Sequence, residues 1–280
     1  MLRRLTRTRA AVLVALPLTL AAPLVAVAAS NDQVEISATP QPVQVVPLPC
    51  FPAGKVSVGM TNTGRKPRFA DMRISGDDAL TLSRHQFSSY LPVGQLVKAP
   101  LELTVPRGSA PATHHVELTV GKDSLRVPVE IKPIPARENV LLGEQAVASS
   151  THGNMRLCGG VDGNADTEQW GASGWHDADK GVFPDAYGVD FVQPTTIGRI
   201  VLQTLDSQRY PAAVMGIRDF DVQVRTGASE WTTLHEIRAN TTGRVTVTFG
   251  PRAVDAVRVV VHDSNDHGYS RIVELEAYAS

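Results

Sequence analysis

Short runs in which apolar and polar residues alternate recur along the whole chain. In the first half they lie at residues 55–60, 100–105, 114–120 and 124–131. Turn-forming groups such as Asn-Thr-Gly and Gly-Lys-Asp bound these runs. A period of two is typical of half-buried β-strands, and turn signals at this spacing are typical of a β-sandwich. We therefore predict an all-β sandwich over residues 32–133.

The same pattern resumes after residue 138. Its runs lie at residues 187–191, 196–205, 219–225, 243–249, 255–262 and 271–279. This alternation predicts the half-buried strands of a second antiparallel sandwich, over residues 139–280, with most candidate binding residues in its loops. Between the halves, Pro133 and Pro135 precede mixed charge, which predicts a short, stiff linker over residues 134–138.

The N-terminal residues follow a different pattern. Arg3, Arg4, Arg7 and Arg9 precede an uncharged run over residues 10–29 that ends in small residues. These are the parts of a secretory signal, which we predict over residues 1–28, so that the mature protein is exported without a membrane segment of its own. A retained membrane anchor is the alternative, because the run is about as long as a bilayer-spanning helix.

Composition and cysteine content narrow the functional classes. The 280 residues have a formal net charge of −1 and are 20% charged, so no basic surface for nucleic acid is expected. Only Cys50 and Cys158 are present. In an oxidising compartment they form either one bridge across a very long loop or two separate thiols, and the sequence leaves both open. The excess of arginine over lysine and the alanine-rich N-terminus indicate a bacterial source by composition only.

Five segments of the second half carry a family resemblance. In order they are NVLLGEQAVASS, VDGNADTEQW, PDAYGVDFVQPTTIGRIVL, IRDFDVQVRTGASEWTTL and YSRIVELEAYA. Together they resemble the discoidin, or coagulation factor V/VIII type C, domain, and within it the galactose-binding-like modules of carbohydrate-binding family 32. The resemblance implies a jelly-roll β-sandwich that is usually noncatalytic, with binding loops at one end and often a structural calcium.

The first half carries a looser resemblance. MTNTG at 60–64 and LTVPRGSAPATHHVELTV at 103–120 resemble the immunoglobulin-like domains that accompany bacterial glycoside hydrolases and sugar-binding modules. This resemblance implies that the first sandwich is an immunoglobulin-like spacer.

The stretch VDGNADTEQW contains a candidate calcium site. Asp162, Asn164 and Asp166 have the spacing of the first ligands in a helix-loop-helix calcium loop. Thr167 and Ser173 occupy the positions where that loop needs glycine and a bidentate glutamate, so the sensor reading fails.

The family resemblance implies a different Ca²⁺ site in the same loop. Its ligands would be Asp162, Asn164, Thr167 and, from the last strand, Glu274. Calcium accepts six to eight oxygen ligands in irregular geometry, so this set is chemically sound. Glu276 lies on the same strand face and stays an alternative to Glu274. A polar turn with solvated carboxylates is the alternative to any metal site.

A saccharide site needs an aromatic face and planar polar groups. Loop residues that offer these are Trp175, His176, Arg209, Tyr210, His267 and Tyr269. Among them we favour Trp175, His176 and Arg209, because they combine stacking with hydrogen bonding. Trp170, Trp231 and Phe220 adjoin strand or turn motifs and are predicted to be packing residues.

No catalytic motif stands out. The sequence lacks a nucleophile elbow, a zinc-protease helix and a phosphate-binding glycine loop. We therefore predict a secreted, noncatalytic protein that recognises extracellular glycan or polysaccharide, with association to a cell surface left open. A lipid- or protein-binding module, a structural cell-surface protein and, less favoured, a hydrolase with two inward-facing carboxylates are the alternatives.

Overall fold

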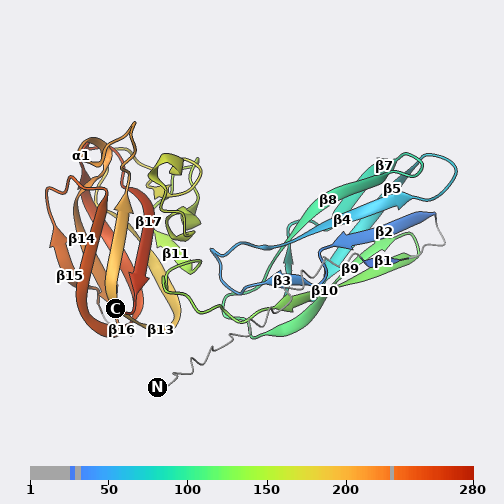
Figure 1. Cartoon of the computed structure of the whole chain (residues 1–280), viewed down its shortest axis with the longest axis horizontal. Helices are drawn as coiled ribbons and strands as arrows, with labels where there is room; N and C mark the ends of the chain where they lie inside the picture. Colours follow the sequence, from blue (N-terminus) through green and yellow to red (C-terminus); the bar gives the residue numbers. More distant parts are fainter. Residues whose placement is uncertain (1–25, 29–32, 228–229) are drawn as a thin grey trace, which may run out of the picture.

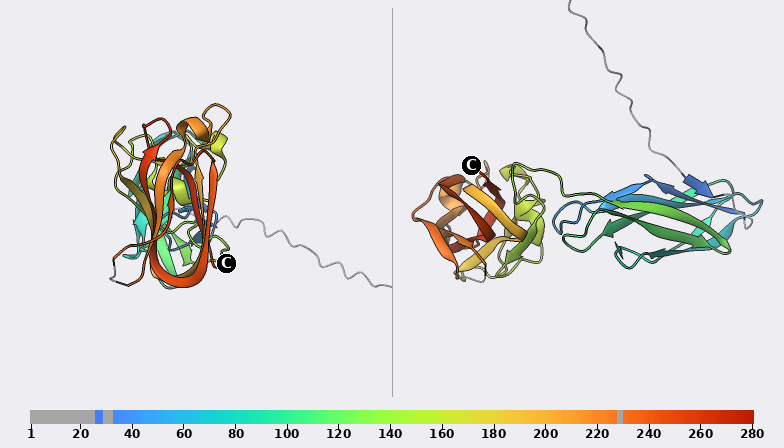
Figure 2. Two further views of the ribbon diagram at one scale, coloured as in Figure 1. Left: turned by 90° about the vertical axis from the view of Figure 1, so that its left-hand side faces the viewer. Right: turned by 90° about the horizontal axis from the view of Figure 1, so that it is seen from below.

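The computed structural model describes residues 26–28, 33–227 and 230–280. Two β-rich domains lie next to each other along the long axis of the molecule (Figure 1), and the view from below separates them clearly (Figure 2). Each domain has its own cluster of buried apolar residues. The chain therefore forms two hydrophobic cores, as the two blocks of alternating sequence predict.

The first domain contains two five-stranded sheets. Their strand orders are β1-β2-β4-β8-β6 and β3-β10-β9-β5-β7. In β5, Ala70, Met72 and Ile74 are buried while the residues between them are exposed, which is how one face of a strand covers the core. The strands are β1 (Ala26–Ala28), β2 (Val34–Thr39), β3 (Val43–Val45), β4 (Gly54–Asn62), β5 (Arg68–Gly76), β6 (Thr81–Leu82), β7 (Gln86–Leu91), β8 (Leu96–Thr104), β9 (Ala112–Val120) and β10 (Asp123–Ile131).

The second domain contains one seven-stranded, curled sheet. Its order is β12-β17-β13-β16-β14-β15, and β11 pairs with β13. Trp175, Tyr187 and Phe220 are the largest fully buried side chains of its core. The strands are β11 (Gln145–Ala148), β12 (Trp175–His176), β13 (Asp185–Thr204), β14 (Ile217–Arg225), β15 (Thr232–Ile237), β16 (Arg244–Ser264) and β17 (Arg271–Tyr278). The helices are η1 (Leu157–Val161), η2 (Thr167–Gln169) and α1 (Ala212–Met215).

Two long strands build both layers of this sandwich. The first part of β13 pairs with β11 and with the last part of β16, whereas the last part of β13 pairs with β17 and with the first part of β16. Register shifts between Asp190 and Thr195 and between Ile197 and Arg199 interrupt the pairing. Such irregularities bend a strand, so one strand continues from layer to layer. The sequence pattern predicted two separate strands in each case, and that division is wrong.

A disulfide and several polar contacts join the two domains. Cys50 and Cys158 are bridged, with their Cα atoms 5.2 Å apart, and the main-chain amide of Cys50 donates to the carbonyl of Gly143 at 3.0 Å. Cys50 thereby joins the core of the second domain. Arg107 of the first domain lies 3.7 Å from the carboxylate of Glu144. The segment between β10 and residue 138, where the linker is predicted, has no regular secondary structure.

Some expectations about the first domain and the N-terminus stay predictions. The first domain is a β-sandwich, but its resemblance to immunoglobulin-like domains is not established by this topology alone. Most of the predicted signal sequence lies outside the described residues, and residues 26–28 pair with β2. Within the described part of the chain, no helix has the length and apolar character needed to cross a membrane.

Candidate functional site

The short helices and long loops of the second domain gather in its upper part in Figure 1. Two of these loops are tied together beside η2. The hydroxyl of Thr167 donates to the carbonyl of Asp206 at 2.7 Å, and the amide of Gln208 donates to the Glu168 carboxylate at 2.7 Å. The loop after β13 is therefore held against the loop that precedes Trp170.

Four rings meet at this end of the domain. We call His152, Trp170, His176 and Tyr269 the ring cluster. The ring centroid of His176 lies 4.6 Å from that of His152, 4.7 Å from that of Tyr269 and 5.7 Å from that of Trp170. His176 is 7% exposed, whereas the other three residues are half-buried. Segments distant in the sequence thus build one partly exposed aromatic surface.

The two histidines offer complementary hydrogen-bonding groups. Nδ1 of His176 lies 2.7 Å from the carbonyl of Asp177, which only accepts, so this nitrogen carries the proton. Burial, and to a smaller extent the proximity of His152 and Arg271, lowers the pKa of His176. The neutral ring therefore presents Nε2 as an acceptor. His152 accepts from the amide of Asn154 through Nδ1, which makes its Nε2 a donor when the ring is neutral.

A buried polar layer supports the ring cluster. Asp177 accepts from the amide of Ser270 at 2.6 Å, and the hydroxyl of Ser270 donates to Asp185 at 2.7 Å. Burial raises the pKa of both carboxyls. Arg271 forms a two-point ion pair with Asp266 at 2.9 and 2.8 Å. These contacts hold the start of β17 and the loop before it, which carries Tyr269.

Trp175 is not a binding residue, and its prediction is wrong. Its side chain is 0% exposed, and its ring lies 4.7 Å from that of Tyr187 in the core. The indole nitrogen donates to the carbonyl of Ser150 and the hydroxyl of Thr151. Trp175 lies on β12, which pairs with β17, so the strand directs this ring inward. Its neighbour His176 is directed toward the ring cluster.

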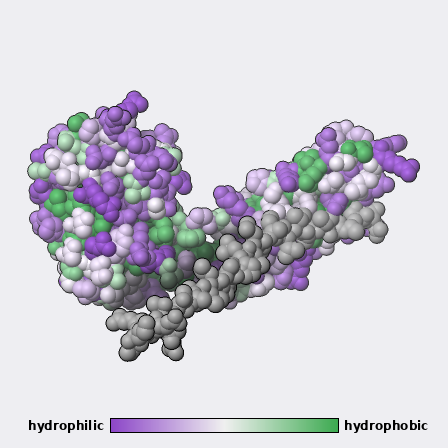
Figure 3. Space-filling model, in the orientation of Figure 1, coloured by the Kyte–Doolittle hydropathy of each residue, from purple (hydrophilic) through white to green (hydrophobic). Residues whose placement is uncertain are grey.

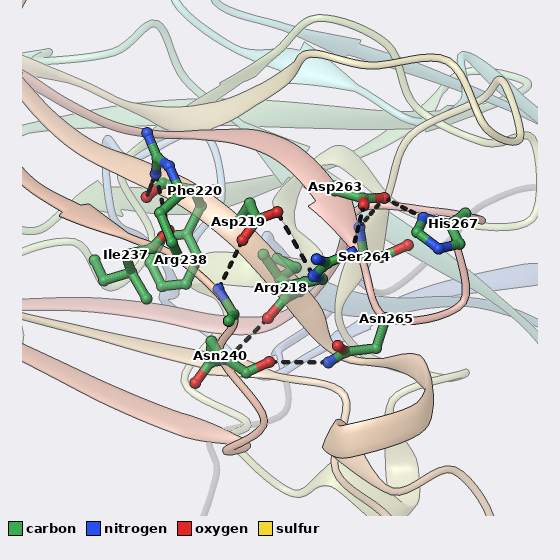
Figure 4. Close-up of polar contacts among 12 residues, drawn as sticks. Arg218, Asp219, Phe220, Ile237, Arg238, Asn240, Asp263, Ser264, Asn265 and His267 are labelled. Atoms are coloured by element: carbon green, nitrogen blue, oxygen red, sulfur yellow. Dashed lines mark hydrogen bonds and ion pairs between the residues drawn. The ribbon is translucent and has the colours of Figure 1, made fainter.

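The other predicted binding residues lie in two loops, one before α1 and one between β16 and β17. Arg209 is exposed and its guanidinium lies 5.1 Å from the Tyr210 ring centroid, in the loop tied to η2. His267 is exposed and is held by Asp263 at 2.9 Å, as the close-up shows (Figure 4). Arg218 binds the same carboxylate at 3.2 Å. His267 thus belongs to a polar network, while Tyr269 belongs to the ring cluster.

The predicted metal-binding loop is a chain of polar turns. The side chain of Asp162 accepts from the amide of Asn164, that of Asn164 from the amide of Asp166, and that of Asp166 from the amide of Glu168. Arg156 pairs with Asp162 at 2.8 Å. Across the described residues, no three acidic, histidine or cysteine side chains gather as a metal-binding group. Main-chain and hydroxyl oxygens would have to complete any calcium site.

Glu274 fits a cation better than the loop carboxylates do. It is 0% exposed, its Oε1 accepts from the amide of Gly163 at 3.1 Å, and its Oε2 has no partner within the described structure. Burial, with the nearby charge of Asp162, raises the pKa of Glu274 to about 8. An unpartnered buried carboxylate oxygen is costly, and a cation would satisfy it. Glu276 instead pairs with Arg244 at 3.0 Å.

The sequence-based reasoning missed two residues of the ring cluster. Trp170 was predicted to pack, yet it is half-buried beside His176. His152 was not considered. The Thr-His-Gly-Asn sequence around His152 is a turn signal in a loop, which is the one cue that it lies at the rim.

A family model matches part of the second domain. It is described as the NedA-like, galactose-binding domain of the F5/F8 type C group, and it matches residues 159–259. The predicted resemblance to the discoidin domain is thereby confirmed for these residues. Among curated proteins, none matches the chain.

Several solved structures are similar to about half of the chain. Chitosan-binding module 1 of a chitosanase/glucanase from Paenibacillus sp. IK-5 is 23% identical, covering 51% of this chain and 99% of that one, with a TM-score of 0.42. The family 32 module of NanJ from Clostridium perfringens, in complex with galactose, is 19% identical, covering 48% and 92%, with a TM-score of 0.39. The family 32 module of EndoD from Streptococcus pneumoniae is 20% identical, covering 51% and 99%, with a TM-score of 0.41.

Proposed function

We propose that this protein is a secreted, noncatalytic glycan-binding protein whose second domain binds saccharide at the ring cluster. The observation that carries the proposal is the meeting of Trp170, His152 and Tyr269 around the ring of His176. The arginine-led, apolar run at residues 3–29 supports the proposed export.

The chemistry of the ring cluster suits a pyranose. Such a sugar has an apolar face that packs on an aromatic ring and hydroxyls that need both donors and acceptors. Trp170 and Tyr269 supply ring surface, while the Nε2 atoms of His176 and His152 supply an acceptor and a donor. The description of the family model as galactose-binding supports a saccharide ligand for this domain.

The buried carboxylates support a binding role over hydrolysis. Asp177 and Asp185 are 1% and 6% exposed, and serine and main-chain groups donate to them. A glycoside hydrolase needs two carboxyl groups that face the scissile bond in a cleft. These two instead hold the loops beneath the ring cluster.

A glycan array at fixed calcium concentration tests the proposal. The intact chain is expected to bind a defined set of neutral glycans, and Tyr269→Ala is expected to weaken that binding about tenfold or more. Tyr90→Ala, which removes an exposed tyrosine of the first domain, is the matched control and should bind as the unsubstituted chain does. Equal binding by all three proteins would place the sugar elsewhere.

We further propose that a structural calcium ion binds between the Asp162 loop and Glu274. The buried, unpartnered Oε2 of Glu274 supports this proposal. Asn164 and Thr167 would contribute main-chain or hydroxyl oxygens, which calcium accepts. The ion would join this loop to the last strand and stabilise the domain.

Thermal unfolding with and without chelator tests the ion. At a hundredfold excess of calcium over its Kd, removal should lower the free energy of unfolding by about 2.7 kcal/mol. Glu274→Gln should abolish the response to chelator, and Glu276→Gln, on the same strand, should keep it. A chelator without effect on the unsubstituted chain would favour the solvated turn.

A lipid-binding function is the second candidate. Val182 and Val214 are 61% and 57% exposed at loop and helix positions of the second domain. Exposed apolar residues on loops are what a membrane-binding discoidin domain would use. The space-filling view otherwise shows mixed polar and apolar residues rather than one broad apolar face (Figure 3). Sedimentation with anionic liposomes, compared between the unsubstituted chain and Val182→Asp, would reveal this function.

A further inference from the structure

A groove of about 350 Å³ lies on the outward face of the second domain. Ala148 from β11, Ala186 and Gly188 from β13, and Arg258 from β16 line it, and Trp231 borders it. None of its lining residues belongs to the ring cluster.

The strand register explains why the groove is there. Arg258 is paired with Gly188 on one side and with Gln223 on the other. Val257 and Val259 are buried, so Arg258 between them faces outward. A Cβ atom at Gly188 would lie 2.1 Å from the carbonyl oxygen of Val257, so only glycine fits there. The small residues of β11 and β13 thus leave a hollow beside two large side chains.

The guanidinium of Arg258 is held in a fixed orientation. It lies 4.1 Å from the Trp231 ring centroid, and its Nε donates to the side-chain oxygen of Gln223 at 2.8 Å. Among the described residues no hydrogen bond engages its two Nη groups, which form a planar pair of donors on a side chain that lines the groove. A guanidinium already held in this way loses little conformational freedom when it binds a ligand.

Within the described residues, the positive charge of Arg258 has no carboxylate partner. Arg225 also lies by Trp231, with its guanidinium 5.1 Å from the ring centroid, and it pairs with Asp190 at 3.0 Å. Throughout the described residues, no acidic group forms an ion pair with Arg258. Burial, and then the charge of Arg225, lowers the pKa of Arg258. An anion bound in the groove would offset the repulsion from Arg225 and stabilise the charged guanidinium.

We propose that this groove is a second saccharide site, in which Arg258 binds the carboxylate of an acidic sugar unit whose ring packs beside Trp231. A carboxylate accepts two parallel hydrogen bonds from the planar Nη pair of an arginine. The groove volume is at the small end of the range for ligand sites, about 300 to 1,000 Å³, which suits a single sugar unit. The identity of the ligand as a saccharide rests on the proposed function.

The test compares an acidic trisaccharide with its neutral counterpart. Trigalacturonic acid and galactotriose are titrated into the full chain at constant ionic strength, with affinity read by calorimetry and location read from NMR shifts of the Trp231 indole N–H. The acidic sugar is expected to shift that resonance. Arg258→Gln should weaken its binding about tenfold or more, as expected for the loss of a charged hydrogen-bonded pair, and Arg258→Lys should weaken it less.

A matched control is available on the same strand. Arg252 also lies on β16 and over an aromatic ring, 5.6 Å from the Phe249 centroid, but outside the groove. Arg252→Gln should leave the affinity for the acidic sugar unchanged. Tyr269→Ala should likewise leave it unchanged, although it weakens neutral glycan binding at the ring cluster.

Three results would overturn the groove proposal. The first is an unshifted Trp231 indole N–H resonance at millimolar trigalacturonic acid. The second is an affinity of Arg258→Gln for that sugar equal to that of the unsubstituted chain, and the third is an equal loss of affinity in Arg258→Gln and Arg252→Gln. The first result needs no variant, so it decides the matter even if Arg258→Gln fails to fold. If the unsubstituted chain binds trigalacturonic acid but no neutral glycan, the ring-cluster proposal fails and the groove proposal stands.

Discussion

The two sandwiches use the same kind of sequence in different ways. In the first domain no described strand exceeds nine residues, and each strand serves one sheet. In the second, β13 and β16 have 20 and 21 residues and run through both layers. The long connection over residues 149–184, which includes β12, carries His152, Trp170 and His176, and the short connection over residues 265–270 carries Tyr269. The loop at 205–216 is held beside them through η2. In this molecule the candidate binding residues therefore lie in the connections of the domain with the longest strands.

The largest expected effect comes from a substitution that should damage only the second domain. A Cβ at Gly159 would lie 1.9 Å from the carbonyl oxygen of Gly174, so the backbone must move. Gly159→Ala should lower the free energy of unfolding of this domain by about 3 kcal/mol or more. Calorimetry should show one shifted transition and one unshifted. Gly153→Ala, whose Cβ meets nothing within 4 Å, is the control, and equal shifts in the two variants would contradict the prediction.

The next largest effect concerns the bridge that joins the domains. Cys50 packs in the second core although it precedes β4 of the first domain. Cys50→Ser should lower the free energy of unfolding of the second domain by about 2 kcal/mol, at the low end of what a long-loop disulfide contributes. A reducing agent should destabilise the unsubstituted chain by the same amount and leave the variant unchanged. A shift confined to the first domain would show that the bridge serves that domain instead.

A smaller effect is expected at the ring cluster. Trp170→Ala should weaken neutral glycan binding by about 1 to 2 kcal/mol. This is the free energy expected from one aromatic contact and the apolar surface that the sugar removes from water. Trp231→Ala removes the other half-buried tryptophan of this domain and should leave neutral binding unchanged. Calorimetric titration of one array-selected glycan would measure both. Equal losses would remove the distinction between the two sites.

The smallest effect is the pH dependence of the second domain. The folded-state pKa of His176 lies below its ordinary value, chiefly because the ring is buried. As pH falls below about 6.5, the unfolded chain binds a proton that the folded domain does not, so stability decreases. His176→Gln should make the transition temperature of this domain less dependent on pH between 7 and 5. An unchanged slope in the variant would assign the dependence to other groups.

The sequence predicted most of the framework. The runs at 55–60, 114–120 and 124–131 lie within β4, β9 and β10, and the all-β class and the separation into two sandwiches follow from the same pattern. These features depend on a local two-residue period, which each segment carries by itself. Short strands such as β6 and β12 were missed because two residues carry no readable period.

The roles of individual loop residues were decided by tertiary contacts. Trp170 and Trp175 lie five residues apart in one segment, yet β17 draws Trp175 inward by pairing with β12 and leaves Trp170 at the rim. The pairing of Cys50 with Cys158 was likewise open until the two domains were placed side by side.

Sequence alone thus determined which segments form strands and which faces of them are apolar, because a strand alternates regardless of its neighbours. Only the tertiary structure decided which rings gather around His176. It also decided that, among the described residues, Oε2 of Glu274 has no hydrogen-bond partner and Arg258 has no ion-pair partner. The physical reason is that burial, pairing and charge compensation of a side chain depend on segments far away in the chain.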